Sequence, residues 1–334
     1  TQRVAHMIDE GIAPGQILAV TFTNKAAREM RQRVAKRIPK PRTRDDGQPD
    51  KPTICTFHSL CVRILRRHIE KLGYKRNFVI YDQSEQLGVV KKVLSTISGK
   101  DVKADPRELQ SLLSKIKNAG SNGAVLGSEE AVAMAEHIRG RYDTALKASN
   151  AVDFDDLLVL TLRLFDEFPE VLEECCVRYQ FVMVDEYQDT NAAQFALVRA
   201  LAGEHRNLCV VGDDDQSIYG WRGAEISNIL DMEKHFPEVV VIKLEQNYRS
   251  TGVILDAANA VIRNNPRRRP KKLWSAQGPG DLIRLQAYAN EEEEARTVVD
   301  EIEFNRMARR IPWREQAILF RTNVQARPLE TALR

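Results

Sequence analysis

The sequence predicts an α/β fold in which a parallel sheet carries helices on both faces, with a helical insertion in the same chain. Short apolar runs are followed at once by a polar turn and an amphipathic helix, the pattern of strand–turn–helix units. Between about residues 84 and 179, helical periodicity prevails and extended β-branched runs are absent. At 334 residues the chain exceeds one ordinary core, so its length predicts about two domains.

The amino-terminal part contains a helix and the first strand–helix unit. Residues 2–10 have amphipathic helical spacing. Residues 17–22 form an apolar strand, after which Thr23 and Asn24 supply a helix cap. The helix ends before the charged, Pro-rich stretch 39–52, which is predicted to be a surface loop.

A second unit repeats this pattern. Residues 53–57 predict a strand, followed by a helix from about His58 that Gly73 closes. Within the helical region, Asp153 can cap a helix that ends before Pro169.

Strand patterns return in the carboxyl-terminal half. They cover residues 181–184, 208–211 and 239–244, and then 282–286 and 317–320 around a helix from about Glu291. The basic run 264–272 is predicted to be a solvated linker, and contact with phosphate is the less favoured interpretation.

Charge and cysteine content restrict the class of protein. Lys and Arg total 50 against 47 for Asp and Glu, so the net charge of +3 does not itself indicate nucleic acid. The five cysteines are odd in number and lack zinc-ligand spacing, which favours reduced, buried thiols. No apolar run is long enough to span a membrane and no charged-then-apolar leader is present. These features predict a soluble, cytoplasmic protein.

The run 181–184 ends abruptly at two adjacent carboxylates, Asp185 and Glu186. In open parallel sheets, ligands bind beyond the carboxyl ends of the strands. One carboxylate could hold Mg²⁺ against terminal phosphates, while its neighbour orients or deprotonates an attacking water. The alternative is an apolar strand that enters an acidic, solvated turn. By itself, this short motif favours the two interpretations about equally.

A second acidic strand end begins at Gly212 and continues into a Gly-flanked loop. Gln216 offers an uncharged amide that can contact a phosphate. Tyr219 and Trp221, with Arg222 beside them, are the residue types that stack on single-stranded bases. The alternative is that these aromatic rings pack the loop onto the core.

Three further strand ends carry candidate residues. After 239–244, Tyr248 could stack on a purine, and Arg249 could neutralise charge on a transferring phosphoryl group. Thr23 and Asn24 offer a polar helix start for phosphate, while Phe22 either stacks on a base or belongs to the core. Thr56 and His58 occupy the equivalent place in the second unit, where a lone His is more often a helix-start hydrogen bonder.

Taken together and in order, these strings resemble the superfamily-one DNA helicases of the UvrD/Rep/PcrA group. The resemblance covers essentially the whole chain. It is carried by Ala19–Ala27, Thr56–His58, Asp153–Asp156, Val184–Asp189, Gly212–Ala224, Leu244–Ser250 and Arg321–Arg327.

The resemblance implies an ATP- and Mg²⁺-dependent motor that moves 3′ to 5′ on single-stranded DNA and acts at single-strand/duplex junctions, in repair or replication, in a bacterial cytoplasm or nucleoid. Asp185 would hold the metal, Glu186 would activate water, Gln216 and Arg249 would contact the γ-phosphate, and Tyr248 would stack on adenine. The implied DNA-binding residues are Phe22, Thr23, Asn24, Thr56, His58, Tyr219, Trp221 and Arg222.

The same resemblance implies a domain plan. Residues 1–62 and 178–246 would form a first RecA-like domain, 63–177 its helical subdomain, and 247–334 the beginning of a second RecA-like domain.

Two departures from the family pattern qualify this expectation. The sequence contains no Gly-x-x-x-x-Gly-Lys-Ser/Thr loop, and it stops at Arg334, before the later motifs. These departures indicate a fragment of a longer helicase that is inactive alone. The alternatives are the motor part of a RecB/AddA-type helicase-nuclease and a hydrolysis-dead single-strand-binding protein.

Overall fold

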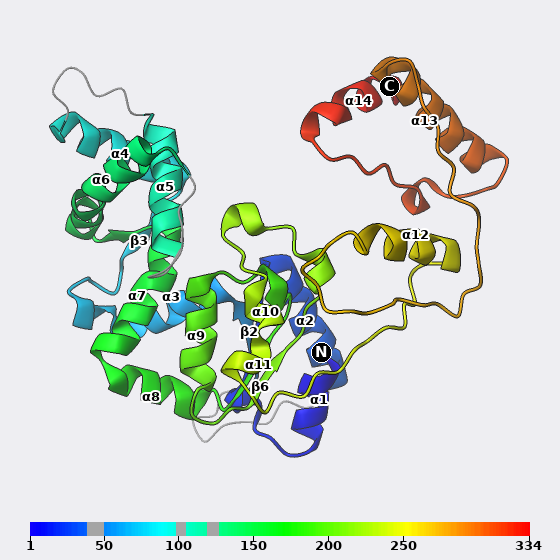
Figure 1. Cartoon of the computed structure of the whole chain (residues 1–334). Helices are drawn as coiled ribbons and strands as arrows, with labels where there is room; N and C mark the ends of the chain where they lie inside the picture. Colours follow the sequence, from blue (N-terminus) through cyan, green and yellow to red (C-terminus); the bar gives the residue numbers. More distant parts are fainter. Residues whose placement is uncertain (39–49, 98–104, 119–126) are drawn as a thin grey trace. The chain divides into compact units, whose positions relative to one another are not determined.

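The computed structural model describes residues 1–38, 50–97, 105–118 and 127–334 (Figure 1). Two compact units are present. Unit 1 comprises Thr1–Ile242 with Asn265–Pro270, and unit 2 comprises Lys243–Asn264 with Lys271–Arg334. Most of the surface loop predicted at 39–52 lies outside the described residues.

A parallel four-stranded sheet forms the centre of unit 1, in the order β2-β1-β5-β6. The strands are β1 (Ile17–Thr21), β2 (Thr53–Thr56), β5 (Phe181–Val184) and β6 (Leu208–Val210). The register pairs Thr21 with Thr56, Val20 with Val184, and Val184 with Val210. All four strands therefore end at the same edge, and the segments that follow them are brought together.

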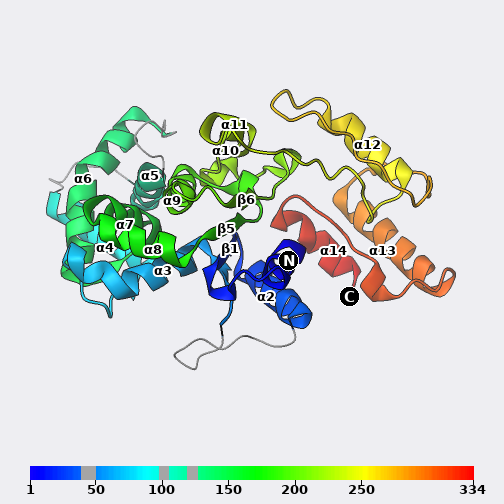
Figure 2. The same cartoon turned by 90° about the horizontal axis from the view of Figure 1, so that it is seen from below.

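Helices cover both faces of this sheet, as the sequence predicts. The α1 (Gln2–Asp9) and α2 (Asn24–Arg37) helices cover one face, and α3 (Phe57–His68), α7 (Phe154–Glu167), α8 (Pro169–Arg178) and α9 (Ala192–Ala202) cover the other (Figure 2). Alternate residues of β1 serve the two sides: Ile17 and Ala19 pack with α1 and α2, and Leu18 and Val20 pack on the larger core.

The segment predicted to be helical is mainly helical in its described residues, and its amino-terminal part has a core of its own. Its helices are α4 (Gln83–Ile97), α5 (Pro106–Asn118) and α6 (Glu129–Ala148). Leu109, Leu112, Ile138 and Tyr142 are among its fully buried residues. One short strand, β4 (Ala151–Val152), interrupts the helices and pairs with β3 (Val79–Ile80), a detail that helical periodicity does not reveal.

The predicted helix boundaries hold where a capping residue supports them. Asp153 caps α7 in a full capping box with Asp156, and Gly73 ends the short helical turn after α3 with φ of 79°. Asn290 caps α13 (Glu291–Met307). Unit 2 also contains α12 (Gly252–Ile262) and α14 (Ala326–Ala332).

Three predicted strands are wrong. In the described part of the chain, 239–244, 282–286 and 317–320 form no strand, and the one isolated bridge nearby joins Gln246 to Trp274. Many apolar side chains in these runs are exposed, including Leu244, Leu285 and Leu319. A strand requires a hydrogen-bonding neighbour, so an apolar run that lacks one stays irregular.

The cysteine prediction is confirmed, because all five cysteines are free thiols and four of them are buried. Burial raises the pKa of Cys61 and of Cys175 to about 12, so these thiols are protonated and unreactive at neutral pH. No helix within the described ranges is long and apolar enough to cross a membrane.

Candidate functional site

The acidic pair lies at the carboxyl edge of the sheet, where backbone bonds continue past the strands. The Asp185 N–H donates to Val20 O at 2.9 Å, and the Tyr187 N–H donates to Val211 O at 3.0 Å. Between them, Glu186 adopts the left-handed region with φ of 54°. This conformation is uncommon for a residue with a side chain and is concentrated at functional sites.

The turn separates the environments of the two carboxylates. Asp185 is half-buried and Glu186 is exposed. Burial, followed by the charge of Glu186, raises the pKa of the Asp185 carboxyl. A divalent cation at this position would oppose both effects.

The carboxylates suit a magnesium ion that shares its ligands with a substrate. Within the described residues, no group of three or more His, Cys, Asp or Glu side chains could hold a metal by itself. Mg²⁺ in phosphate-transfer sites typically uses one or two carboxylates and completes its shell with phosphates and waters. Asp185 fits this limited role better than that of a ligand in a closed protein cage.

Gln188 connects Glu186 to the neighbouring strand end. Its side chain is 1% exposed. The Gln188 Nε2 donates to Glu186 Oε2 at 2.8 Å, and its Oε1 accepts from the Asp213 N–H at 3.0 Å. The buried amide thus sets the position of the exposed carboxylate relative to the loop after β6. Gln188 was not among the predicted site residues, although it stands two residues after Glu186.

The close approach of this loop requires Gly212. A Cβ at position 212 would lie 2.7 Å from Gln188 Oε1 and 2.9 Å from Ile229 Cδ1. Both distances are below ordinary van der Waals contact, so a side chain here would displace the Gln188 amide. The absence of a side chain at Gly212 therefore permits the contact between the two strand ends.

Residues 213–216 form an acidic turn that is held by hydrogen bonds within the turn and from the basic run 264–272. Gln216 is exposed, and its Nε2 donates to Asp213 Oδ2 at 2.8 Å. From the basic run, Arg268 makes two hydrogen bonds to Asp215, at 2.8 and 2.7 Å. Arg269 donates its backbone N–H to Asp214 at 2.8 Å.

These contacts correct the prediction of a solvated linker at 264–272. The Arg268 side chain is only 13% exposed, and the side chain of its partner Asp215 only 14%. Arg269 also pairs with Glu233, so the run neutralises acidic groups of unit 1. Charge content alone could not distinguish this internal pairing from solvation.

Aromatic rings form a row beside the acidic turn. Tyr219 stacks on Phe22 with ring centroids 5.5 Å apart and an interplanar angle of 19°. Trp221 lies 6.4 Å from Tyr219 and is 68% exposed. Phe22 and Tyr219 are half-buried and Trp221 is exposed, so the three rings line a surface.

A pocket of about 410 Å³ continues the row across the ends of β1 and β2. It is lined by Phe22, Asn24, Thr56, His58, Ser59, Val62, Arg63, Ile80, Phe154 and Leu157. The His58 and Phe154 rings are 4.4 Å apart. Burial lowers the pKa of His58 to about 4, so its ring is neutral at physiological pH and can stack but adds no charge.

Phe154 and Arg63 are members of this pocket that the sequence analysis did not identify. Phe154 is 54% exposed although it is the first residue of α7. A large apolar side chain flanked by the acidic residues Asp153 and Asp155 was the available signal. Arg63 supplies a cation that the other pocket residues lack.

Thr23 and Thr56, which lie at or just beyond the ends of β1 and β2, have a structural role as helix caps. Thr23 Oγ1 accepts from the Ala26 N–H at 3.1 Å, and Thr56 Oγ1 accepts from the Ser59 N–H at 3.3 Å. Both are N-caps. The side chain of Arg222 lies outside the described part of the structure.

Tyr248 and Arg249 belong to unit 2. Tyr248 is 75% exposed, and its hydroxyl donates to Gln246 Oε1 at 2.8 Å. The Arg249 N–H donates to Asn247 Oδ1 at 2.9 Å. The two residues stand next to each other on an exposed turn.

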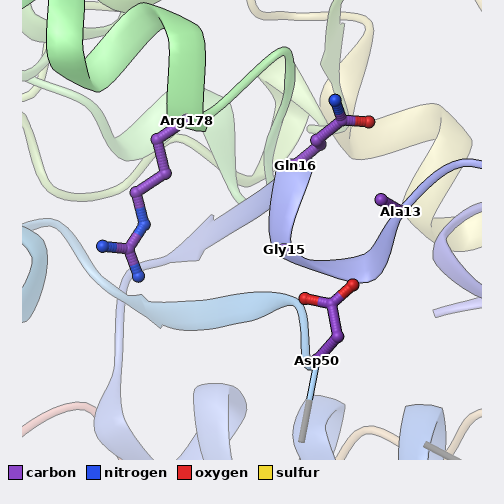
Figure 3. Close-up of a pocket in the computed structure, with 5 residues that line it drawn as sticks. All are labelled: Ala13, Gly15, Gln16, Asp50 and Arg178. Carbon is purple, nitrogen blue, oxygen red and sulfur yellow. The ribbon is translucent and has the colours of Figure 1, made fainter. Parts of the chain in front are cut away.

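A second pocket, of about 330 Å³, lies at the opposite edge of the sheet (Figure 3). Its lining residues Gln16, Asp50 and Arg178 all precede strands β1, β2 and β5. Ligands of open parallel sheets bind beyond the carboxyl ends, so this pocket is not the candidate site.

The fold and this edge define an α/β protein whose candidate ligand site lies at the carboxyl ends of a parallel sheet. The chain belongs to the UvrD-like helicase family. The UvrD/REP helicase N-terminal domain matches residues 1–237, and the UvrD-like helicase C-terminal domain matches residues 242–334.

Two groups of relatives extend this finding. The chain is 45% identical over 335 residues to the ATP-dependent DNA helicase PcrA of Staphylococcus aureus, and 44% identical over 334 residues to that of Staphylococcus epidermidis. Each alignment covers 99% of this chain and 45% of the relative. The chain thus spans a little under half the length of the curated relatives it matches.

Proposed function

We propose that this chain is part of an ATP-dependent DNA helicase that moves 3′ to 5′ along single-stranded DNA. The observation that carries the proposal is the shared sheet edge. Glu186 and the Gln216 loop are linked through Gln188 and Asp213, and the same loop leads directly to Tyr219. The residue proposed to contact phosphate and the ring proposed to stack on a base are thus joined by one short, internally bonded segment.

For the nucleotide side of the site, we propose that Asp185 holds Mg²⁺ and that Glu186 accepts a proton from the attacking water. The ion would neutralise charge on the terminal phosphates. Gln216 would contact the γ-phosphate. In unit 2, Tyr248 would stack on adenine, and Arg249 would contact the γ-phosphate through its planar guanidinium.

On the DNA side, we propose that the aromatic row and the pocket hold successive bases. Phe22, Tyr219 and Trp221 offer faces for stacking, and His58 and Phe154 continue them. The remaining contacts, from Thr23, Asn24, Thr56, Arg63 and Arg222, would be to the strand backbone. Such a surface tolerates any base sequence.

The wider setting is also part of the proposal. Residues 1–62 and 178–246 correspond to a first RecA-like domain, 63–177 to its helical subdomain, and 247–334 to the beginning of a second. Action at single-strand/duplex junctions, in repair or replication and in a bacterial cytoplasm or nucleoid, agrees with the family.

Trp221→Ala should weaken binding of a fluorescent oligo(dT) to this chain by about 5- to 150-fold, because one stacked base contributes about 1–3 kcal/mol. Fluorescence anisotropy at fixed salt measures the change. Trp313→Ala in unit 2 is the matched control and should leave affinity unchanged. Equal affinity of Trp221→Ala and the unmodified chain would remove the stacking role.

The 334-residue chain by itself should bind ATP weakly and hydrolyse essentially none, because its sequence has no phosphate loop to hold the β- and γ-phosphates. Phosphate release with and without oligo(dT) measures this. A substantial rate that Glu186→Gln abolishes would show that other groups bind the triphosphate.

A further inference from the structure

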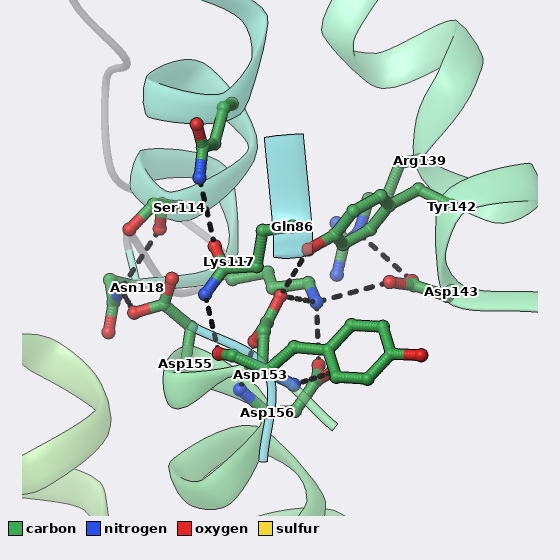
Figure 4. A network of polar contacts seen from close by, with 12 residues as sticks. Gln86, Ser114, Lys117, Asn118, Arg139, Tyr142, Asp143, Asp153, Asp155 and Asp156 are labelled. Carbon is green, nitrogen blue, oxygen red and sulfur yellow. Dashed lines mark hydrogen bonds and ion pairs between the residues drawn. The ribbon is translucent and has the colours of Figure 1, made fainter. Parts of the chain in front are cut away.

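The Asp153–Asp156 segment is one of the strings that resemble the helicase family. Among its residues, the proposed function gives a role only to Phe154. The three carboxylates of this segment, Asp153, Asp155 and Asp156, are not among the residues that line the pocket. They join a polar cluster at the junction of α5, α6 and α7 (Figure 4). One branch of this cluster leads towards the acidic strand end.

Asn118, the last residue of α5, forms that branch. Its Nδ2 donates to Asp155 Oδ1 at 2.6 Å and to Ser114 O at 2.9 Å. Its Oδ1 accepts from Asn191 Nδ2 at 2.9 Å. The side-chain amide therefore uses both of its ends, and it joins the first turn of α7 to the residue that caps α9.

On the α7 side, the link reaches the proposed DNA pocket. Asp155 follows Phe154 directly, and the Phe154 ring rests against His58. The first turn of α7 is held further by the Asp153–Asp156 capping box. A base that stacks on Phe154 would therefore act directly on the position of this turn.

On the α9 side, the link reaches the proposed catalytic carboxylate. Asn191 caps α9 in a capping box with Gln194. The preceding Thr190 donates its hydroxyl to Tyr187 O at 2.7 Å, and the Asp189 N–H donates to Glu186 O at 3.0 Å. One short, hydrogen-bonded turn therefore separates Asn191 from Glu186.

We propose that Asn118 is a positioning residue that transmits strand binding at the Phe154 pocket to the segment that carries Glu186. The inference rests on the proposed DNA-binding function. The amide is suited to this role because a displacement of Asp155 moves the group that orients Asn191. In its absence, the two helix starts have no side-chain bridge through this position.

Hydrogen–deuterium exchange of the chain, with and without oligo(dT), tests the proposal. In the unmodified protein, the oligonucleotide should slow exchange both at the pocket, residues 57–64, and at 187–195. In Asn118→Ala, protection at the pocket should remain, while protection at 187–195 should fall by about fivefold, the effect of losing roughly one net hydrogen bond. Gln110→Ala, which removes contacts of α5 with α4 only, is the matched control.

A reciprocal exchange separates the link from a general loss of structure. In the double variant Asn118→Asp/Asp155→Asn, the amide at 155 can donate to the carboxylate at 118, which can still accept from Asn191. Protection at 187–195 should therefore return. Full protection there in Asn118→Ala would overturn the link, as would failure of the double variant to restore it. Absence of oligo(dT) binding by the unmodified chain would overturn the DNA-binding function and the link together.

Discussion

Glu186→Gln should lower the rate of ATP hydrolysis by about 10²- to 10⁴-fold, the usual contribution of a general base. The substitution keeps the shape of the side chain and removes its proton affinity. The effect should be measured as kcat with saturating single-stranded DNA, in a full-length protein that carries this segment and a phosphate-binding loop. Oligo(dT) affinity should stay the same, because Glu186 is not among the residues that line the pocket and its carboxylate is held by Gln188.

The matched control is Glu204→Gln, an exposed carboxylate just beyond the end of α9. It should retain full activity. If Glu186→Gln kept more than about a tenth of the rate, a loss well below the usual contribution of a general base, another residue would have to accept the proton.

Lys117→Met should destabilise unit 1 by about 3–5 kcal/mol, the usual cost of breaking a buried ion pair. The Lys117 side chain is 3% exposed, and its Nζ lies 2.6 Å from Asp156, 2.8 Å from Asp153 and 3.2 Å from Asp143 (Figure 4). Burial by itself would lower the pKa of Lys117, but these carboxylates outweigh it and raise the pKa. Methionine fills the space of the stem and leaves the carboxylates uncompensated.

Urea unfolding at neutral pH measures this loss, and Lys91→Met on the exposed side of α4 is the control, with an expected change within about 0.5 kcal/mol. The loss should become smaller below pH 6. Burial raises the pKa of Asp156 to about 6 in the folded protein, above its ordinary value of 3.8, so the folded state takes up a proton first as the pH falls. A loss that did not depend on pH would show that the repulsion among the carboxylates is not its cause.

Strand ends were the most predictable part of this protein. The runs 17–20 and 181–184 are continuously apolar, as expected for strands buried on both faces, and both lie in strands of the central sheet. The same kind of run failed at 239–244. Apolar content reports that a segment can be buried in a sheet, whereas pairing depends on which neighbour the rest of the fold supplies.

Residues with a locally determined role were also predictable. Asp153 and Thr23 cap helices because the partner N–H group lies within the next turn of the chain. The basic run 264–272 was not predictable in this way. Its partners Asp215 and Glu233 are 53 and 36 residues away in sequence from Arg268 and Arg269, and only folding brings them together.

The sequence by itself determined how far Asp185, Glu186, Gln216 and Trp221 stand beyond the ends of their strands, and hence the family and the kind of chemistry expected. Those features depend on short spacings that every conformation of the chain preserves. Tertiary structure decided how the residues are connected. The Gln188 amide reaches the turn after β6, and Asn118 joins Asp155 to Asn191, because sheet register and helix packing bring distant segments within 3 Å of each other. Hydrogen bonds act only at such distances, so a linear pattern of residues does not contain them.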